Sequence, residues 1–288
     1  MKRSGLKFWL FLLPALISFV FVVLVPMLIG FGFSLTDWNG ISDSTTFVGL
    51  KNFVRMFTAD SNFIHALFFT FGIVLFTIIL VNLTGLSLAL LVTQKIKGSN
   101  FLRSIFFMPN LIGGLLLGFT WKFIFIDIFS MIGKALGLSF LQGWLSNMQT
   151  GFWGIIILNV WQMSGYMMVI YIAQLQQIPN SVLEAAKIDG ANCFQSFRSV
   201  VFPLLMPAFT IGVFFSMVNS FKMFDQNLAL TNGDPYRSTE MLALNIFNTA
   251  FSNHEFGYAQ AKAVVFLAVV AFLGLCQLLF TKKKEVEM

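Results

Sequence analysis

The sequence predicts an all-α membrane protein. Its 288 residues are 57% hydrophobic and only 10% charged, whereas roughly 25% of the residues in an ordinary soluble domain are charged. The mean hydropathy of +0.83 is that of a chain that would aggregate in water. Six apolar runs each approach the length of about 20 residues that crosses the hydrocarbon core. Each run must form a helix, because lipid offers no hydrogen bonds to an open backbone.

The predicted spans follow these runs in order. The first run is uncharged and follows Lys2, Arg3 and Lys7, as a secretion signal would. It is too long for the apolar region of a signal peptide and no small-residue cleavage site follows, so we expect a retained span. One membrane domain over residues 1–288 is predicted, with spans at approximately 8–33, 63–92, 104–126, 151–175, 199–221 and 258–280.

The charges of the connecting segments predict the orientation. With the N-terminus inside, most of the 18 Lys and Arg residues lie in cytoplasmic segments and most of the 12 Asp and Glu residues lie outside. Basic residues are retained on the cytoplasmic side, so both termini are predicted to face the cytoplasm. The net charge of +6 reflects this asymmetry. We therefore expect membrane lipid around the chain and no nucleic-acid partner.

Motifs for chemistry are missing from the sequence. It contains no phosphate-binding loop, no H-E-x-x-H and no C-x-x-C, and its two histidines, His65 and His254, lie far apart. We expect no catalytic residues, no metal site and no cofactor in this chain, which argues against a membrane enzyme. Cys193 and Cys276 indicate no disulfide framework.

Ionisable residues are nearly absent from the predicted spans, whereas ion-driven transporters usually need buried carboxylates or histidines. This absence indicates an energy source outside the chain. The alternative is a stand-alone secondary transporter of a small neutral solute.

One polar segment, residues 176–203, separates the fourth and fifth spans on the predicted cytoplasmic side; we call it the elbow. Pro179 ends the preceding helix, and Asn180 or Ser181 can cap a new one. Glu184 is predicted in the first turn of that helix, where the helix dipole favours a carboxylate.

Gly190 then supplies a turn, and residues 192–199 restart a helix that leads into the fifth span. The sequence therefore predicts an L-shaped helix pair, in which Ala185 and Ala186 let the surface of another protein approach closely. A surface connector without a partner is the alternative.

The elbow resembles the EAA loop of binding-protein-dependent ABC importer permeases. The resemblance rests on Glu184-Ala185-Ala186, three residues, Gly190, nine residues and then Val200-Val201-Phe202-Pro203. The family pattern ends in Ile and Leu-Pro, so the apolar character and the proline are kept while the side chains differ. Four further segments are similar to segments of maltose and multiple-sugar permeases: "FVGLKNFVRMF", "RSIFFMPNLIGG", "NVWQMSGYMMVIYIAQLQQIP" and "LTNGDPYRSTEML". They are most similar to the larger maltose permease subunit, without its extra N-terminal spans and its large external insertion.

The resemblance implies a type I ABC importer permease fold and ATP-driven import of a sugar or oligosaccharide. It implies a heterodimer with a sister permease, two copies of a cytoplasmic ATPase that bind ATP and Mg, and an extracytoplasmic sugar-binding protein. In such importers the EAA loop docks in a groove of the ATPase. The residues implied in coupling are Glu184, Ala185, Ala186, Asp189 and Gly190.

Polar and aromatic side chains in the fourth and fifth spans suit a sugar, which is bound by hydrogen bonds and by aromatic faces. Corresponding stretches line the transport path of the maltose importer that the chain resembles. The predicted path residues are Asn159, Trp161, Gln162, Tyr166, Ser216, Asn219 and Ser220. For each, an interhelical hydrogen bond is the alternative, and for Trp161 and Tyr166 it is helix packing. Lys222 and Asp225 either contact the binding protein or mark the membrane interface.

Overall fold

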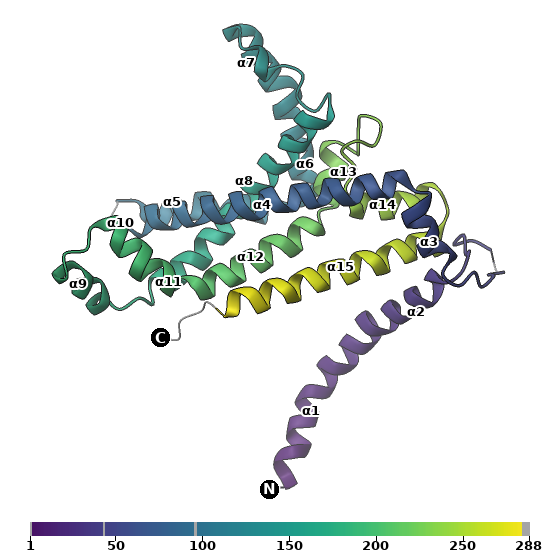
Figure 1. Ribbon diagram of the computed structural model, residues 1–288, viewed down its shortest axis with the longest axis horizontal. Helices are drawn as coiled ribbons and strands as arrows, with labels where there is room; N and C mark the ends of the chain where they lie inside the picture. Colours follow the sequence, from purple (N-terminus) through teal and green to yellow (C-terminus); the bar gives the residue numbers. More distant parts are fainter. Residues whose placement is uncertain (1, 43, 95–96, 284–288) are drawn as a thin grey trace. The chain divides into compact units, whose positions relative to one another are not determined.

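The computed structural model describes residues 2–42, 44–94 and 97–283. The side chains of residues 2–7, among them Lys2, Arg3 and Lys7, lie outside this description. Within the described ranges the structure is helical (Figure 1), and the extended pairing present there is a single bridge between Thr36 and Phe47. The chain forms two compact units. One ends at Ile64 and resumes over Asn245–Ala268, and the other comprises His65–Leu244 and resumes at Val269.

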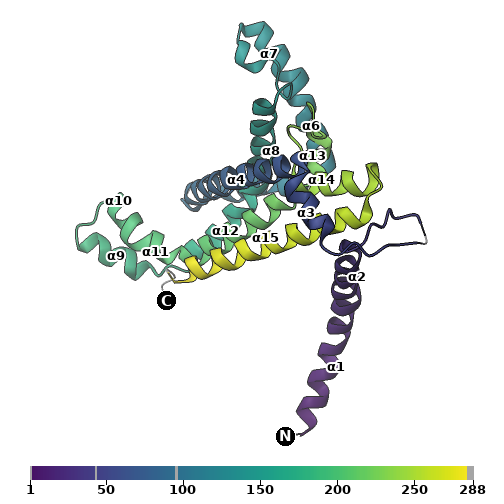
Figure 2. The ribbon, with the colours of Figure 1, turned by 45° about the vertical axis from the view of Figure 1, so that its right-hand side comes forward.

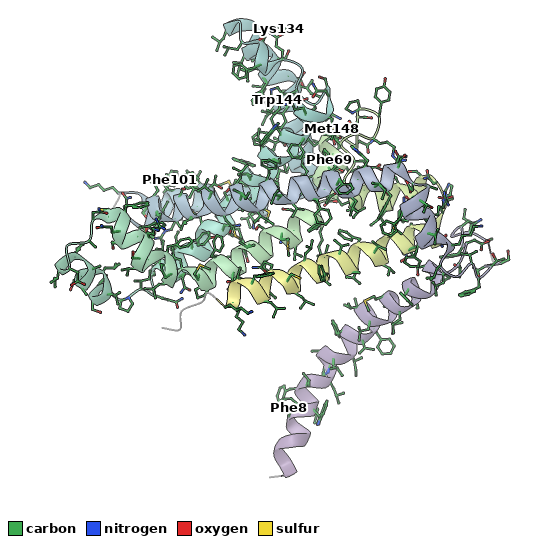
Figure 3. The ribbon with its side chains drawn as sticks, viewed as in Figure 1. Phe8, Phe69, Phe101, Lys134, Trp144 and Met148 are labelled. Atoms are coloured by element: carbon green, nitrogen blue, oxygen red, sulfur yellow. The ribbon has the colours of Figure 1, made fainter. Side chains whose placement is uncertain are left out.

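The first unit begins with a long, nearly continuous helix. A wide π-turn separates its two α-helical parts directly before Pro26, whose missing N–H disturbs the hydrogen-bond ladder. The exposed Phe8 lies on its first part (Figure 3). The helices of this unit are α1 (Lys2–Phe19), η1 (Val20–Leu24), α2 (Val25–Ser34), α3 (Lys51–Thr58), η6 (Asn248–Ser252) and the beginning of α15 (Phe256–Lys282).

The second unit holds most of the helices. Its central helix is α8, in whose most apolar stretch 67% of the residues are buried. The elements are α4 (Ser61–Thr93), α5 (Ser99–Phe107), η2 (Met108–Leu111), α6 (Gly114–Phe123), η3 (Ile124–Ile128), α7 (Phe129–Leu136), η4 (Ser139–Leu141), α8 (Met148–Leu175), α9 (Asn180–Ile188), α10 (Cys193–Ser196), η5 (Phe197–Val201), α11 (Phe202–Leu204), α12 (Met206–Phe221), α13 (Asp225–Leu230) and α14 (Leu242–Phe247). α4 begins, and α14 ends, in the first unit.

Two apolar clusters hold the second unit together. One includes Phe69 (Figure 3) and brings α4 against α6 and α8, and the other includes Met167 and brings α4 and α8 against α12. Glycines allow close approach at these contacts: a Cβ on Gly85 would lie 2.5 Å from Cβ of Met167. α4, α8 and α12 therefore pack as a tight bundle.

Five described helices are long and apolar enough to cross a membrane, and the number is six if the bent pair Cys193–Leu204 and Met206–Phe221 counts as one span. The third crossing differs from the predicted 104–126. The helix that contains Ser104 ends at Phe107, and the crossing helix begins at Gly114 and continues to Leu136. Pro109 cannot donate to a helical ladder and Gly113 is extended, with ψ of 142°, so the chain breaks between them.

The segment predicted as the fifth span is also broken. The helical segment Cys193–Leu204 and α12 meet at Leu205 with a bend of 68°. Pro207 has no N–H to donate to the preceding turn, which places the kink at this point. The elbow projects beyond the end of α12 in Figures 1 and 2.

Candidate functional site

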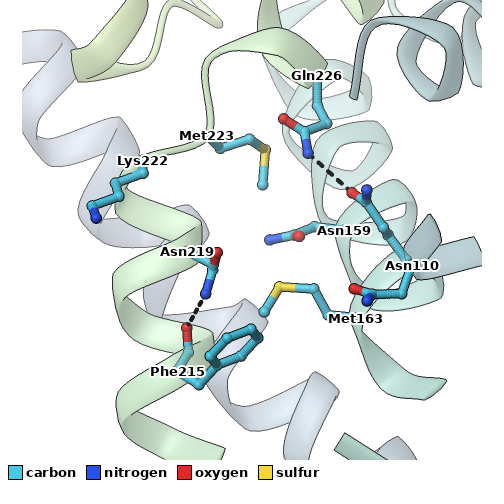
Figure 4. Close-up of a pocket in the computed structure, with 9 residues that line it drawn as sticks. Asn110, Asn159, Met163, Phe215, Asn219, Lys222, Met223 and Gln226 are labelled. Atoms are coloured by element: carbon cyan, nitrogen blue, oxygen red, sulfur yellow. Dashed lines mark hydrogen bonds between the residues drawn. The ribbon is translucent and has the colours of Figure 1, made fainter. Parts of the chain in front are cut away.

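A polar cavity of about 170 Å³ lies between α8, α12 and α13 (Figure 4). Asn159, Asn219 and Gln226 reach it from these three helices, and Asn110 reaches it from the break before α6. The lining residues are Asn110, Asn159, Gln162, Met163, Phe215, Asn219, Lys222, Met223 and Gln226. Among the described residues no carboxylate lines this cavity, so its chemistry is that of amides with one flanking lysine.

The amides are held in place by a few hydrogen bonds. Asn159 Nδ2 donates to Ser220 Oγ at 3.1 Å, and Asn219 Nδ2 donates to the Phe215 carbonyl at 2.9 Å. Gln162 donates to the Ile112 carbonyl at 3.2 Å and accepts from Gln226 Nε2 at 3.0 Å. An amide has two donors and two acceptor lone pairs. Bonds among the described residues use only part of this capacity, which leaves donors and acceptors for a ligand.

The structure brings three of the predicted path residues to the cavity: Asn159, Gln162 and Asn219. Ser220 is fully buried and orients Asn159. Tyr166 stacks on the lining residue Phe215, with ring centroids 4.5 Å apart.

The other two predicted residues lie elsewhere. Ser216 is fully buried and accepts from Asn82, so it makes the interhelical contact that was its alternative. Trp161 is 44% exposed, packs against Trp121 and lines a separate apolar groove of about 800 Å³ between α4, α5 and α8.

Asn110, Gln226 and Lys222 were not predicted to line a path. Asn110 directly follows Pro109, which breaks the helix, and Gln226 lies just after the end of α12. A polar residue next to a helix break is the sequence signal that could have identified both. Lys222 was predicted only to contact the binding protein or to mark the membrane interface.

The elbow forms the predicted helix pair with two local differences. α9 starts at Asn180 after Pro179, and neither Asn180 nor Ser181 serves as its cap. Glu184 is therefore in the second turn rather than the first. Gly190 has a φ of +80°, in the left-handed region that suits glycine.

The second helix of the elbow starts as expected at Asn192. Its side chain accepts from the Gln195 N–H at 2.8 Å, and the Gln195 side chain accepts from the Asn192 N–H at 2.9 Å. This capping box fixes the start of α10, which continues through η5 and α11 to the bend.

The outer surface of the elbow combines charge with exposed apolar side chains. Glu184, Ala185, Asp189 and Gly190 are exposed, whereas Ala186 is only 8% exposed. Ile188 is 85% exposed and Phe194 is 69% exposed. Exposed large apolar side chains beside polar ones are typical of a surface that receives another protein.

The first unit contains a charged side chain that sequence reasoning missed in the sixth span. Lys262 of α15 is 2% exposed, although the spans were expected to be nearly free of ionisable groups. Its Nζ lies 2.8 Å from Asp60 Oδ2, and it donates to Asn245 and Thr249 at 2.9 and 2.8 Å. Tyr258 lies under the same Nζ and donates to Asp60 Oδ2. We call these five residues the ionic cluster.

Burial would raise the pKa of Asp60, but hydrogen bonds outweigh it. Donation from Lys262, from the Phe63 N–H and from Tyr258 holds the pKa of this carboxyl below its usual value. Nearby, Arg55 and Glu255 form a paired ion bridge at 2.9 and 3.1 Å. Within the described residues no three His, Cys, Asp or Glu side chains are placed to hold a metal ion.

Comparisons with known proteins agree with this architecture. A probable starch degradation products transport system permease protein, AmyD of Thermoanaerobacterium thermosulfurigenes, is 51% identical over 99% of this chain and 97% of its own. The multiple sugar-binding transport system permease protein MsmF of Streptococcus mutans is 33% identical, with 96% of each chain covered. A chain in the crystal structure of a bacterial ABC transporter that imports the acidic polysaccharide alginate has the same fold, with a TM-score of 0.83 at 19% identity over 98% of this chain and 96% of that one.

The predicted all-helical permease fold is thereby confirmed. The family model described as "binding-protein-dependent transport system inner membrane component" matches residues 82–286, which include the cavity and the elbow. The chain belongs to this family of multi-pass inner-membrane transport components.

Proposed function

We propose that this chain is the permease subunit of an ATP-driven importer that moves sugars, in particular oligosaccharides derived from starch. The relative that is 51% identical is named for the transport of starch degradation products, and MsmF is named for multiple sugars. Both likenesses extend over almost the whole chain, so they include the lining of the cavity.

The cavity is the observation that carries this proposal. A neutral sugar presents hydroxyl groups that donate and accept hydrogen bonds, and it needs no counter-charge. The lining provides amides from Asn110, Asn159 and Asn219, with an aromatic face from Phe215. A cavity built from amides without a carboxylate suits such a solute better than it suits a metal ion or an amine.

The proposed partners follow from the family. They are a sister permease, two copies of a cytoplasmic ATPase that bind ATP and Mg, and an extracytoplasmic sugar-binding protein. The chain itself would hydrolyse no ATP. One structure of the alginate ABC transporter is a complex with a periplasmic protein that holds an alginate pentasaccharide.

Energy would enter through the elbow. Glu184 is exposed on α9 and can pair with a basic side chain of the ATPase, while exposed Ile188 and Phe194 offer apolar contact area. Gly190 sets the turn between the two elbow helices, with open space around the position of a Cβ. A short stiff helix seated in a partner transmits movement better than a flexible loop does.

Two substitutions test this role. We expect Glu184→Lys and Gly190→Pro to leave the assembled complex in the membrane while abolishing ATP-dependent uptake of labelled maltotriose. Gly190→Pro forces φ to about −65° at a left-handed position. Uptake in vesicles and ATPase activity of the purified complex are the measurements.

Gly137→Pro is the matched control, because Gly137 is also left-handed, follows a helix and has no neighbour within 4 Å. Gly137 lies outside the elbow, and we expect the complex with Gly137→Pro to keep ATP-dependent uptake of maltotriose. Wild-type uptake in both elbow variants would contradict the coupling role.

The buried Lys262 favours the alternative of a stand-alone secondary transporter, because membrane-embedded charges often mark ion pathways. Against it, Lys262 donates to three fixed acceptors and does not line the cavity. Uptake by this chain alone, in vesicles without ATP, would establish the alternative.

A further inference from the structure

Three polar bridges hold α8 against the bent helical segment that leaves the elbow: one reaches α11, before the bend, and two reach α12, after it. Nearest to the elbow, Gln174 Nε2 donates to the Leu204 carbonyl at 3.0 Å. In the middle, Asn82 of α4 joins the two helices: Tyr171 Oη donates to Asn82 Oδ1 at 2.7 Å, and Asn82 Nδ2 donates to Ser216 Oγ at 3.1 Å. At the cavity, Asn159 donates to Ser220 at 3.1 Å.

The bridges follow the whole distance from the elbow to the cavity. On α8 they begin at Gln174 and end at Asn159, and at a rise of 1.5 Å per residue this separation is about 22 Å. α8 carries Asn159 and Gln162 into the cavity, and α12 carries Asn219. The same two helices thus bear the ligand groups at one end and the elbow at the other.

The middle bridge is deeply buried. Asn82 is 5% exposed, Tyr171 is 1% exposed and Ser216 is fully buried. Side chains this deeply buried are shielded from bulk water, which would otherwise compete for their hydrogen bonds. Gly212 makes room for them, since a Cβ at this position would lie 2.6 Å from Asn82 Oδ1. We call Asn82, Tyr171 and Ser216 the neutral bridge.

The bridge nearest the elbow occupies a mechanically critical place. The helical segment that leaves the elbow bends by 68° against α12 at Leu205, and Leu204 is the last residue before this bend. A bend of this size would let the elbow move without moving α12. Gln174 closes the base of the elbow by bonding the end of α8 to Leu204.

We propose that Gln174, Tyr171 and Asn82 are positioning residues that join α8 to α11 and α12 as one strut, through which movement of the elbow reaches the cavity. This inference rests on the proposed function. Without the bridges, a push on the elbow would be absorbed at the bend, and ATP would be hydrolysed with less solute moved.

The test measures coupling rather than activity alone. Complexes carrying Tyr171→Phe or Gln174→Leu are reconstituted with the ATPase and the binding protein, and labelled maltotriose imported per ATP hydrolysed is measured. Tyr171→Phe keeps the ring and removes only the hydroxyl group. We expect the ratio to fall roughly three- to tenfold in each variant, the range that one interhelical hydrogen bond supports. ATP hydrolysis and the yield of complex stay near wild type.

Gln277→Leu is the matched control. Gln277 Nε2 also donates to a backbone carbonyl, that of Thr210, at 3.2 Å, but it joins α12 to α15. A wild-type ratio in both bridge variants would overturn the proposal, as would an equal fall in Gln277→Leu or a failure of both bridge variants to assemble. A wild-type complex that imports maltotriose without ATP would instead overturn the proposed function.

Discussion

The ionic cluster of the first unit and the neutral bridge of the second solve the same problem with different chemistry. Both bury polar side chains among apolar helices, and both link segments that are distant in sequence. The cluster uses a lysine and a carboxylate, with side chains that are 3% and 17% exposed. The bridge uses an amide and two hydroxyl groups, and none of its members needs a counter-charge.

The difference concerns how strongly each junction resists rearrangement. A buried ion pair that loses one partner leaves an uncompensated charge, which costs several kcal/mol. A neutral interhelical hydrogen bond in a membrane protein contributes about 0.6 kcal/mol. The ionic cluster is therefore suited to fix its helices permanently. The neutral bridge keeps two helices in register and still allows them to shift as a pair relative to their neighbours.

The largest effect is expected at Lys262. Lys262→Met keeps an unbranched side chain that is one atom shorter, and it removes the charge that faces Asp60, Asn245 and Thr249. We expect the free energy of unfolding to fall by about 3 kcal/mol. This value is at the low end of the range for a broken buried ion pair, because Asp60 is partly exposed. The thermal midpoint of the purified complex is the measurement.

The double variant Lys262→Met with Asp60→Asn sharpens this test. It removes both charges, and the asparagine can still accept from Tyr258. We expect it to recover most of the lost stability. If the double variant is as unstable as the sum of the two single variants, the ionic cluster is not held by its charge pair.

A smaller effect is expected at Gly212. In Gly212→Ala the new methyl group meets Asn82 Oδ1 at 2.6 Å and Tyr171 Oη at 3.1 Å, so the neutral bridge must shift. Overpacking of this kind costs about 1–3 kcal/mol. Gly32→Ala is the control, because Gly32 is also helical but has no neighbour within 4 Å. Equal thermal midpoints of the two variants would mean that the bridge tolerates crowding.

The sequence was sufficient to predict most of the helices, because each crossing is a long apolar run. The elbow was also predictable, since Pro179, Gly190 and Asn192 act locally as helix stop, turn and cap. The start of the third crossing could not be predicted, because residues 104–113 are mostly apolar and their hydropathy conceals the break that Pro109 and Gly113 make.

The candidate site was predictable only in part, for a related reason. Asn159, Gln162 and Asn219 were found as polar residues inside apolar runs. Whether such a residue faces a cavity or another helix depends on the register between helices, which a single sequence does not contain. Ser216 illustrates this point, since it lies one turn from Asn219 and meets Asn82 instead of the cavity. Lys262 was missed because its acceptors come from separate segments.

The smallest effect expected is a difference in acid response between the two polar junctions. The pKa of Asp60 is held below its usual value by Lys262, Phe63 N–H and Tyr258 despite burial, so the carboxylate is favoured in the folded state. Its contribution to stability is present above the unfolded pKa of about 3.9 and is lost as the pH falls through the lower folded pKa. Asn82 and Ser216 have no group that ionises in this range.

Thermal midpoints measured from pH 6 down to about pH 3 should therefore fall more steeply in the wild type than in Asp60→Asn, where the titrating carboxyl is gone. Parallel curves would show that protonation of Asp60 does not weaken the ionic cluster, and that the contrast with the neutral bridge lies in packing rather than in charge.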